Sequence, residues 1–194
     1  MPVKLTDRLV SVSPWIVASF ILAGIVHFVS VLAMPLLAPR DAYARLAAAG
    51  PPGAMTLLPP VRPGAEILPW LDPAFAMGVC RYDLRDGPLR VSASVEPDQY
   101  TSLSFHARHG TLYYALTDRA ASRRKIDIVV LTPAQLESAE AKDNEDEPNP
   151  DLRLLAPQDE LEGFILARAL APDASAFAEA QERVRAIRCA HEPE

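Results

Sequence analysis

His106 and His109 are the only closely spaced histidines in the chain, so they are the first candidates for metal or acid–base chemistry. A zinc site needs three or four ligands in a defined geometry. Side chains alternate between the two faces of a strand, so an H-x-x-H spacing does not place both rings on one face. Asp98 or Asp118 could add a carboxylate, but such a set is more typical of solvated turn residues. We therefore predict no metal site.

Ser102, Ser104 and His106 are two residues apart, which puts them on one face of a predicted strand. Nucleophilic catalysis needs a base beside the serine and a third group that orients the base. The chain has no G-x-S-x-G elbow, no P-loop and no dinucleotide-binding glycine pattern. We therefore assign no catalytic residue and no cofactor.

Aromatic residues flank this predicted strand, and they leave a second interpretation open. Tyr100 precedes it, and Tyr113 and Tyr114 lie on the predicted return strand. Aromatic rings with a few polar groups are typical of small-ligand sites. A candidate ligand-binding set is therefore Tyr100, Ser102, His106 and Tyr113.

Charge is unevenly distributed along the chain, whose formal net charge is −6. Residues 137–151 carry seven acids and one lysine, which is typical of a solvated, extended loop. A basic turn holds Arg119, Arg123, Arg124 and Lys125, and it could contact an acidic partner or lipid headgroups. The net negative charge argues against a nucleic-acid partner.

The elements that must position these residues begin with a stretch without formal charge, residues 9–39. Its 23-residue apolar part, residues 15–37, is long enough to cross a bilayer as a helix. A cleaved signal peptide has a shorter apolar region of about 7–15 residues, although the A-x-A pattern at 42–44 keeps that alternative open. We predict a short arm at 1–12 and a retained transmembrane helix at 13–38.

Cys80 and Cys189 are the only cysteines. An even pair in an exported domain favours a disulfide, whereas two buried free thiols are the alternative. Basic residues flank the apolar stretch almost equally, so they do not orient it. The cysteine pair and the position of the anchor near the N-terminus place the bulk of the chain on the periplasmic side of the inner membrane.

Residues 39–73 hold eight of the nineteen prolines, which disfavours long helices and central strands. We predict a Pro-rich linker at 39–65, whose apolar residues should lie along the following domain. We also predict that a domain follows at 66–194.

Period-two patterns then indicate strands separated by turn signals. They fall at residues 75–84, 89–95, 100–107, 111–117, 126–131, 152–156 and 163–171. Thr132 and Gln135 form a capping box for a short helix at 133–141. A last helix is expected to end near Cys189. The strand spacing indicates an antiparallel β-sandwich or an open barrel. The predicted fold is mainly β, a jelly-roll-like β-sandwich with one or two helices after one transmembrane helix.

Several short motifs resemble a bacterial envelope family called domain of unknown function 1254. They lie at residues 72–74, 80–84, 86–88, 102–105 and 117–119, and the resemblance covers roughly residues 66–190. The N-terminal helix is similar to that of short, membrane-bound members. The resemblance implies a β-sandwich in the envelope, with no settled activity and no agreed catalytic residues.

Together these patterns predict a single-pass membrane protein whose exported domain is a non-enzymatic binding or accessory module for an envelope protein partner. The alternative is an envelope enzyme or small-ligand-binding protein that uses the region of Tyr100, His106 and Tyr113.

Overall fold

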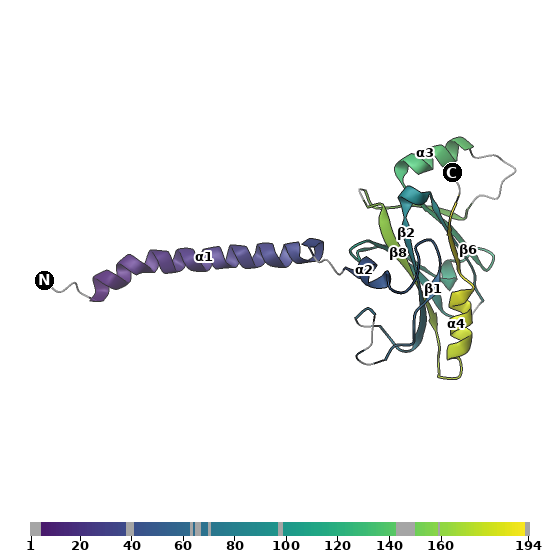
Figure 1. Ribbon diagram of the computed structural model, residues 1–194, viewed down its shortest axis with the longest axis horizontal. Helices are drawn as coiled ribbons and strands as arrows, with labels where there is room; N and C mark the ends of the chain where they lie inside the picture. Colours follow the sequence, from purple (N-terminus) through teal and green to yellow (C-terminus); the bar gives the residue numbers. More distant parts are fainter. Residues whose placement is uncertain are drawn as a thin grey trace. The chain divides into compact units, whose positions relative to one another are not determined.

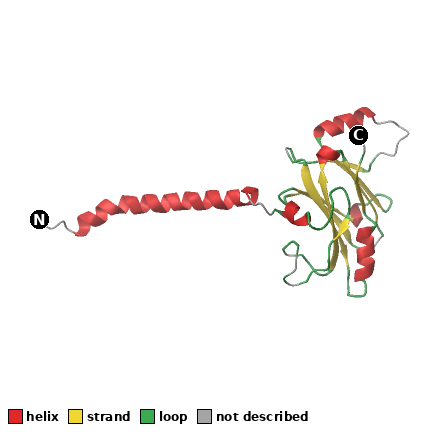
Figure 2. Ribbon diagram, in the orientation of Figure 1, coloured by secondary structure: helices red, strands yellow, loops and turns green. Residues whose placement is uncertain are grey.

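The computed structural model describes residues 5–37, 41–62, 64, 67–69, 71–96, 99–142, 150–158 and 160–192. The chain divides into two compact units, residues 1–39 and residues 40–194. Figure 1 labels the main elements and Figure 2 separates helices from strands by colour. The boundary at residue 40 places most of the predicted linker in the second unit.

The first unit is one helix, α1 (Leu5–Leu37). Its segment Val12–Met34 has a mean hydropathy of 2.4 and is long and apolar enough to cross a membrane. Large apolar side chains such as Trp15, Phe20 and Leu32 are exposed in the protein. The predicted arm is not separate from the predicted span, because the helix already begins at Leu5.

Nine strands in two sheets form the described β-structure of the second unit. The first sheet, sheet A, has the order β1 (Thr56–Leu57), β2 (Phe75–Asp83), β8 (Glu162–Leu170), β4 (Thr101–Ala107), β5 (Leu112–Thr117). The second, sheet B, has the order β7 (Leu152–Leu155), β6 (Lys125–Leu131), β3 (Leu89–Ser94), β9 (Arg188–His191). The predicted mainly-β domain with one long apolar helix is confirmed.

One strand pair departs from the predicted antiparallel pattern, since β6 and β7 are parallel. The chain leaves β6 through α3 (Pro133–Lys142), and such a crossover is what a parallel pair requires. The predicted capping box opens this helix: the Thr132 amide donates to the Gln135 side-chain oxygen at 2.9 Å, and the Gln135 amide donates to the Thr132 hydroxyl at 3.2 Å. Most of the predicted acidic loop, residues 143–149, lies outside the described residues.

The main core lies between the facing sides of the two sheets. Alternate residues on the strands supply it, including Leu103 and Phe105 of β4, Val91 of β3, Ile128 of β6 and Ile165 of β8, each at most 2% exposed. Because strand side chains alternate, the residues between these on β4, Ser102, Ser104 and His106, lie on the outer side of sheet A.

A second apolar cluster covers the outer side of sheet A. We call the described part of residues 41–71 the strap; it contains α2 (Ala42–Leu46) and β1. Leu46 and Leu58 of the strap are buried at 0% and 3% exposure against Met77 and Phe164. The segment predicted as a linker is thus a layer of the domain, and its apolar residues pack as expected.

The C-terminal helix, α4 (Phe177–Arg185), packs against β1, β2 and β8. The sequence pattern predicted that Cys189 ends this helix, and that prediction is wrong. The helix is capped at Ala186, and Cys189 lies in β9, paired opposite Val91 of β3. Backbone pairing with the free edge of β3 outweighs the helical spacing of the apolar residues, which reaches only as far as Ile187.

Candidate functional site

The four residues predicted to bind a ligand do not form one site. Ser102 and His106 lie on the outer side of sheet A, whereas Tyr113 lies on the inner side, with its ring 6.3 Å from that of Phe105. Tyr114 pairs opposite Phe105 and therefore also faces inward, with its ring 5.9 Å away, whereas the register shift between Phe105 and His106 leaves Tyr113 with no residue of β4 opposite it. A β-bulge breaks the strict alternation on which the sequence argument depended.

His106 makes a defined set of contacts on the outer side of the sheet. Its Nδ1 lies 3.1 Å from the Gly110 carbonyl oxygen and its Nε2 lies 3.0 Å from Ser104 Oγ. Because a carbonyl only accepts, Nδ1 carries the proton and Nε2 accepts from the serine hydroxyl. The ring stacks on Phe164 at 4.9 Å, and burial lowers the pKa of His106 below its usual value. This neutral imidazole is a proton acceptor beside a hydroxyl.

Tyr113 has a structural partner rather than a free hydroxyl. Its oxygen lies 2.7 Å from that of Tyr82, which is 1% exposed. Burial raises the pKa of Tyr82 to about 12 and raises the pKa of Tyr113 further. Both phenols therefore stay protonated, and the pair holds together the inner faces of β2 and β5.

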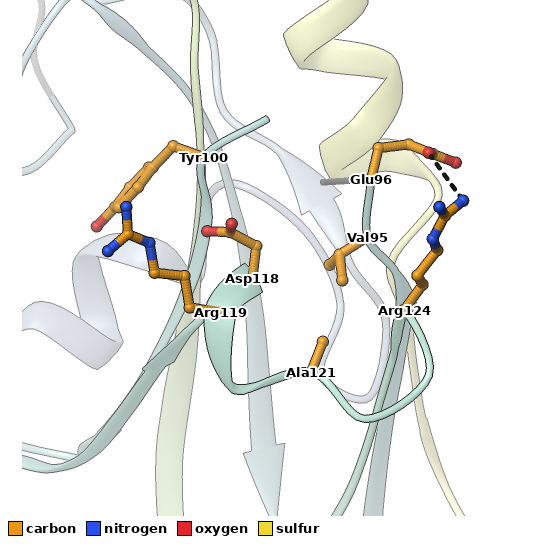
Figure 3. A pocket seen from close by; sticks show the side chains of 7 residues that line it. All are labelled: Val95, Glu96, Tyr100, Asp118, Arg119, Ala121 and Arg124. Atoms are coloured by element: carbon orange, nitrogen blue, oxygen red, sulfur yellow. Dashed lines mark ion pairs between the residues drawn. The ribbon is translucent and has the colours of Figure 1, made fainter. Parts of the chain in front are cut away.

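Tyr100 lines a pocket at one end of the sandwich, drawn in Figure 3. The pocket has a volume of about 510 Å³, and its walls come from the chain after β3, the chain before β4 and the connection between β5 and β6. Its lining residues are Val95, Glu96, Tyr100, Asp118, Arg119, Ala121 and Arg124. These residues come from two parts of the sequence, the connection from β3 to β4 and the connection from β5 to β6.

Among the described residues that line it, the pocket carries two carboxylates and two guanidinium groups. Arg124 lies 3.9 Å from Glu96, and both side chains are about two-thirds exposed (69% and 66%). Asp118 Oδ1 accepts from the Thr101 amide at 3.4 Å. Arg119 has no hydrogen bond or ion pair with any part of the chain that the structure describes. Figure 3 shows Asp118 between the Tyr100–Arg119 side and the Glu96–Arg124 side of the pocket.

The turn before β6 holds Arg124 in place. Lys125 donates its amide to the Ser122 carbonyl at 2.8 Å, and Arg123 and Arg124 occupy the two central positions with φ of 51° and 61°. These angles are those of a type I′ turn, for which Asn-Gly is the favoured sequence. The Val95 amide donates to the Arg124 carbonyl at 2.9 Å, which ties the turn to the opposite pocket wall.

The other predicted chemical groups fall elsewhere. Lys125 of the predicted basic turn pairs with Asp127 at 2.8 Å, outside the pocket lining. His109 Nδ1 lies 3.7 Å from Asp41 of the strap, whereas the two ring nitrogens of His106 contact Gly110 and Ser104. Among the residues that the structure describes, no group of three or more His, Cys, Asp or Glu side chains could hold a metal ion. Cys80 and Cys189 form a disulfide with a Cα–Cα distance of 6.5 Å.

Sequence reasoning identified Tyr100 and the basic turn, but it missed Val95, Glu96 and Ala121 as parts of one site. No local signal marks these three residues, because each belongs to an ordinary strand end or turn. The positions of Arg123 and Arg124 in a hairpin turn were the one available indication, since that turn normally selects Asn and Gly.

Comparison with known proteins supports the fold and gives no function. No protein-family model matches the chain, and no curated protein does. The crystal structure of the VPA0106 protein from Vibrio parahaemolyticus is similar with a TM-score of 0.55 at 12% identity, over 77% of this chain and 34% of that one. An uncharacterized protein from Burkholderia cenocepacia aligns with a TM-score of 0.39 at 13% identity, over 59% of this chain and 31% of that one. The chain thus spans about a third of the length of each, and the first similarity shows a shared β-rich fold.

Proposed function

We propose that the protein is anchored in the inner membrane by α1 and exposes its sandwich on the periplasmic side as a binding module for an envelope partner. Membership of the domain of unknown function 1254 family is part of this proposal. The pocket at the end of the sandwich is its recognition site.

The disulfide between Cys80 and Cys189 is the observation that carries the location. Structural disulfides persist in oxidising compartments and are rare in the cytoplasm. A helical span belongs to the inner membrane, since outer-membrane proteins of the β-barrel type cross as closed sheets. The apolar segment Val12–Met34 supplies such a span.

The pocket supports a binding role. Small-molecule sites are typically concave, with a few placed polar groups among apolar ones, and volumes of about 300–1,000 Å³. This pocket meets that description with Tyr100 and Val95 beside four charged groups. Its walls are braced by the backbone hydrogen bonds from Thr101 and Val95, so its shape exists before a ligand arrives.

The location is tested with the full chain in cells. Alkaline phosphatase fused after Glu194 should be active, and a green fluorescent protein fused at the same position should be dark. When the protein is denatured without reductant and treated with a maleimide, both cysteines should remain unmodified. An inactive phosphatase beside a bright fluorescent fusion would place the domain in the cytoplasm and contradict the proposal.

The contact between Ser104 and His106 favours a second candidate function, serine-dependent acyl transfer. A neutral imidazole that accepts from a hydroxyl at 3.0 Å is the arrangement that activates a serine nucleophile. These residues do not line the pocket, however, and the Leu166 carbonyl, 3.3 Å from the Ser104 hydroxyl, is a second acceptor for its proton. Labelling with a fluorophosphonate probe tests this function. Labelling that is lost in Ser104→Ala and kept in Ser102→Ala supports serine-dependent acyl transfer, and an absence of labelling in the wild type contradicts it.

A further inference from the structure

The pocket lined by Tyr100, Asp118, Arg119 and Arg124 points to a ligand of defined charge. We propose that it binds a small zwitterion that carries a carboxylate and an ammonium group, such as an amino acid or a short peptide. This inference rests on the proposed binding function and names the chemistry of the ligand.

The charges of the pocket favour a ligand of both signs. Arg119 and Arg124 attract an anion, but Glu96 and Asp118 line the same space and would repel one. A purely cationic ligand would be attracted by the two carboxylates and repelled by the two arginines. A molecule with one carboxylate and one ammonium group satisfies both pairs, because each of its charges can lie beside the side chain of opposite sign.

The charged groups are available to a ligand. Arg119 has no ion pair within the described part of the chain. The contact between Arg124 and Glu96 is long, at 3.9 Å, and solvent-exposed, and such pairs contribute little to stability. Asp118 uses Oδ1 to hold the Thr101 amide, while its Oδ2 makes no hydrogen bond to the residues described. A ligand therefore displaces weak contacts rather than strong ones.

The backbone at Arg124 is an independent observation. A non-glycine residue with φ of 61° has a strained backbone, and such strain is concentrated at functional sites. Glycine would relieve it, yet the position holds an arginine whose side chain lines the pocket. Arg123 is equally strained, with φ of 51°, but does not line the pocket. The two neighbours therefore form a matched pair for a test.

Apolar groups define where the rest of the ligand lies. Tyr100 is 42% exposed, and its ring stands edge-on to Phe75 at 5.9 Å, which limits its movement. Its carbonyl accepts from the Leu170 amide at 3.0 Å. With Val95 and Ala121 it forms a wall for a small apolar side chain.

The experiment uses the full chain in detergent micelles and unmodified tri-alanine as the probe, with isothermal titration calorimetry at low salt. We expect saturable binding of tri-alanine. N-acetyl-tri-alanine, which lacks the ammonium group, and tri-alanine amide, which lacks the carboxylate, should each bind about tenfold more weakly. Phosphoethanolamine tests whether a lipid headgroup is the real source of the zwitterion, and it should also bind more weakly.

The variants separate binding from stability. Arg124→Gly and Arg123→Gly should both raise the melting temperature, because glycine accepts a positive φ without strain. Only Arg124→Gly should weaken tri-alanine binding, by about tenfold, while Arg123→Gly leaves the dissociation constant within about twofold. An equal loss of tri-alanine affinity in the two variants would show that binding depends on the conformation of the turn and not on the Arg124 guanidinium.

Three other results would overturn the inference. The first is no saturable binding of tri-alanine up to about 10 mM. The second is equal affinity for the acetylated or amidated peptide. The third is equal or tighter binding of phosphoethanolamine, which would show that the anionic group of the ligand is a phosphate and not a carboxylate. These outcomes are independent of the phosphatase fusion, so a failure of the ligand assignment is distinguishable from a failure of the proposed location.

Discussion

Cys80 in β2 is joined by a disulfide to Cys189 in β9, so the bond connects sheet A to an edge strand of sheet B. The two cysteines are 109 residues apart in the sequence, and nearly the whole sandwich lies between them. Both are buried, at 0% and 7% exposure, within the core between the sheets. The bond therefore closes the domain and attaches its last strand, which also pairs with β3.

Removing this bond should destabilise the domain. In Cys80→Ala/Cys189→Ala we expect the free energy of unfolding to fall by about 2–5 kcal/mol, because the cross-link restricts the unfolded chain over a long loop. Urea unfolding followed by circular dichroism measures the change in the free energy of unfolding. Dithiothreitol should destabilise the wild type to a similar extent and leave the double variant unchanged; an effect of the reductant on both would point to another cause.

The strap should contribute to stability through Leu46. Leu46→Ala removes a fully buried side chain from the cluster on the outer side of sheet A, and we expect a loss of about 2–5 kcal/mol. Leu155→Ala is the matched control, because Leu155 is 46% exposed and should change stability by no more than about 0.5 kcal/mol. If the two variants unfold at the same urea concentration, the strap does not dock on the sheet in solution.

Tyr82 and Tyr113 should be coupled. Tyr113→Phe leaves the buried Tyr82 hydroxyl without its partner and should cost about 1–3 kcal/mol. The double variant Tyr82→Phe/Tyr113→Phe should cost less than the sum of the single changes, since no polar group is left unpaired. Tyr114→Phe is the control, because the structure gives its hydroxyl no hydrogen bond to a described residue. Strict additivity in the cycle would contradict the contact.

Asp127 should make the domain sensitive to acid. Arg90 donates to both oxygens of Asp127 at 2.8 and 2.9 Å, and with Lys125 it lowers the pKa of Asp127 to about 2. The folded pKa lies below the ordinary value of 3.8, so this contribution is complete above pH 3.8 and is lost as the pH falls toward 2.

Unfolding measured from pH 5 to pH 2 tests this acid sensitivity. Asp127→Asn should be less stable at pH 5 and should lose less stability over that range than the wild type, because it has no carboxylate to protonate. Glu140→Gln, an exposed position on α3, is the control and should follow the wild type. Parallel curves for Asp127→Asn and the wild type would show that another group governs the acid transition.

Local patterns were sufficient for most of the elements. Alternation between apolar and polar residues located the strands from Phe75 to Leu131, and the pairing of Thr132 with Gln135 located the start of α3. These features depend on neighbours within a few residues, and their physics acts locally. Proline density, by contrast, predicted a linker where a docked strap lies, because local stiffness does not reveal which distant surface will bury Leu46.

The sequence by itself determined the long apolar helix, the mainly-β character of the domain and the two cysteines available for a bond. Tertiary structure decided that Tyr113 faces Tyr82 while His106 faces outward, because a bulge changes the register of one strand pair. It also decided that Cys189 lies in a strand and that Tyr100, Asp118 and Arg124 meet in one pocket. Such meetings depend on contacts between residues far apart in the chain, and local spacing carries no information about which ends of two sheets will lie together.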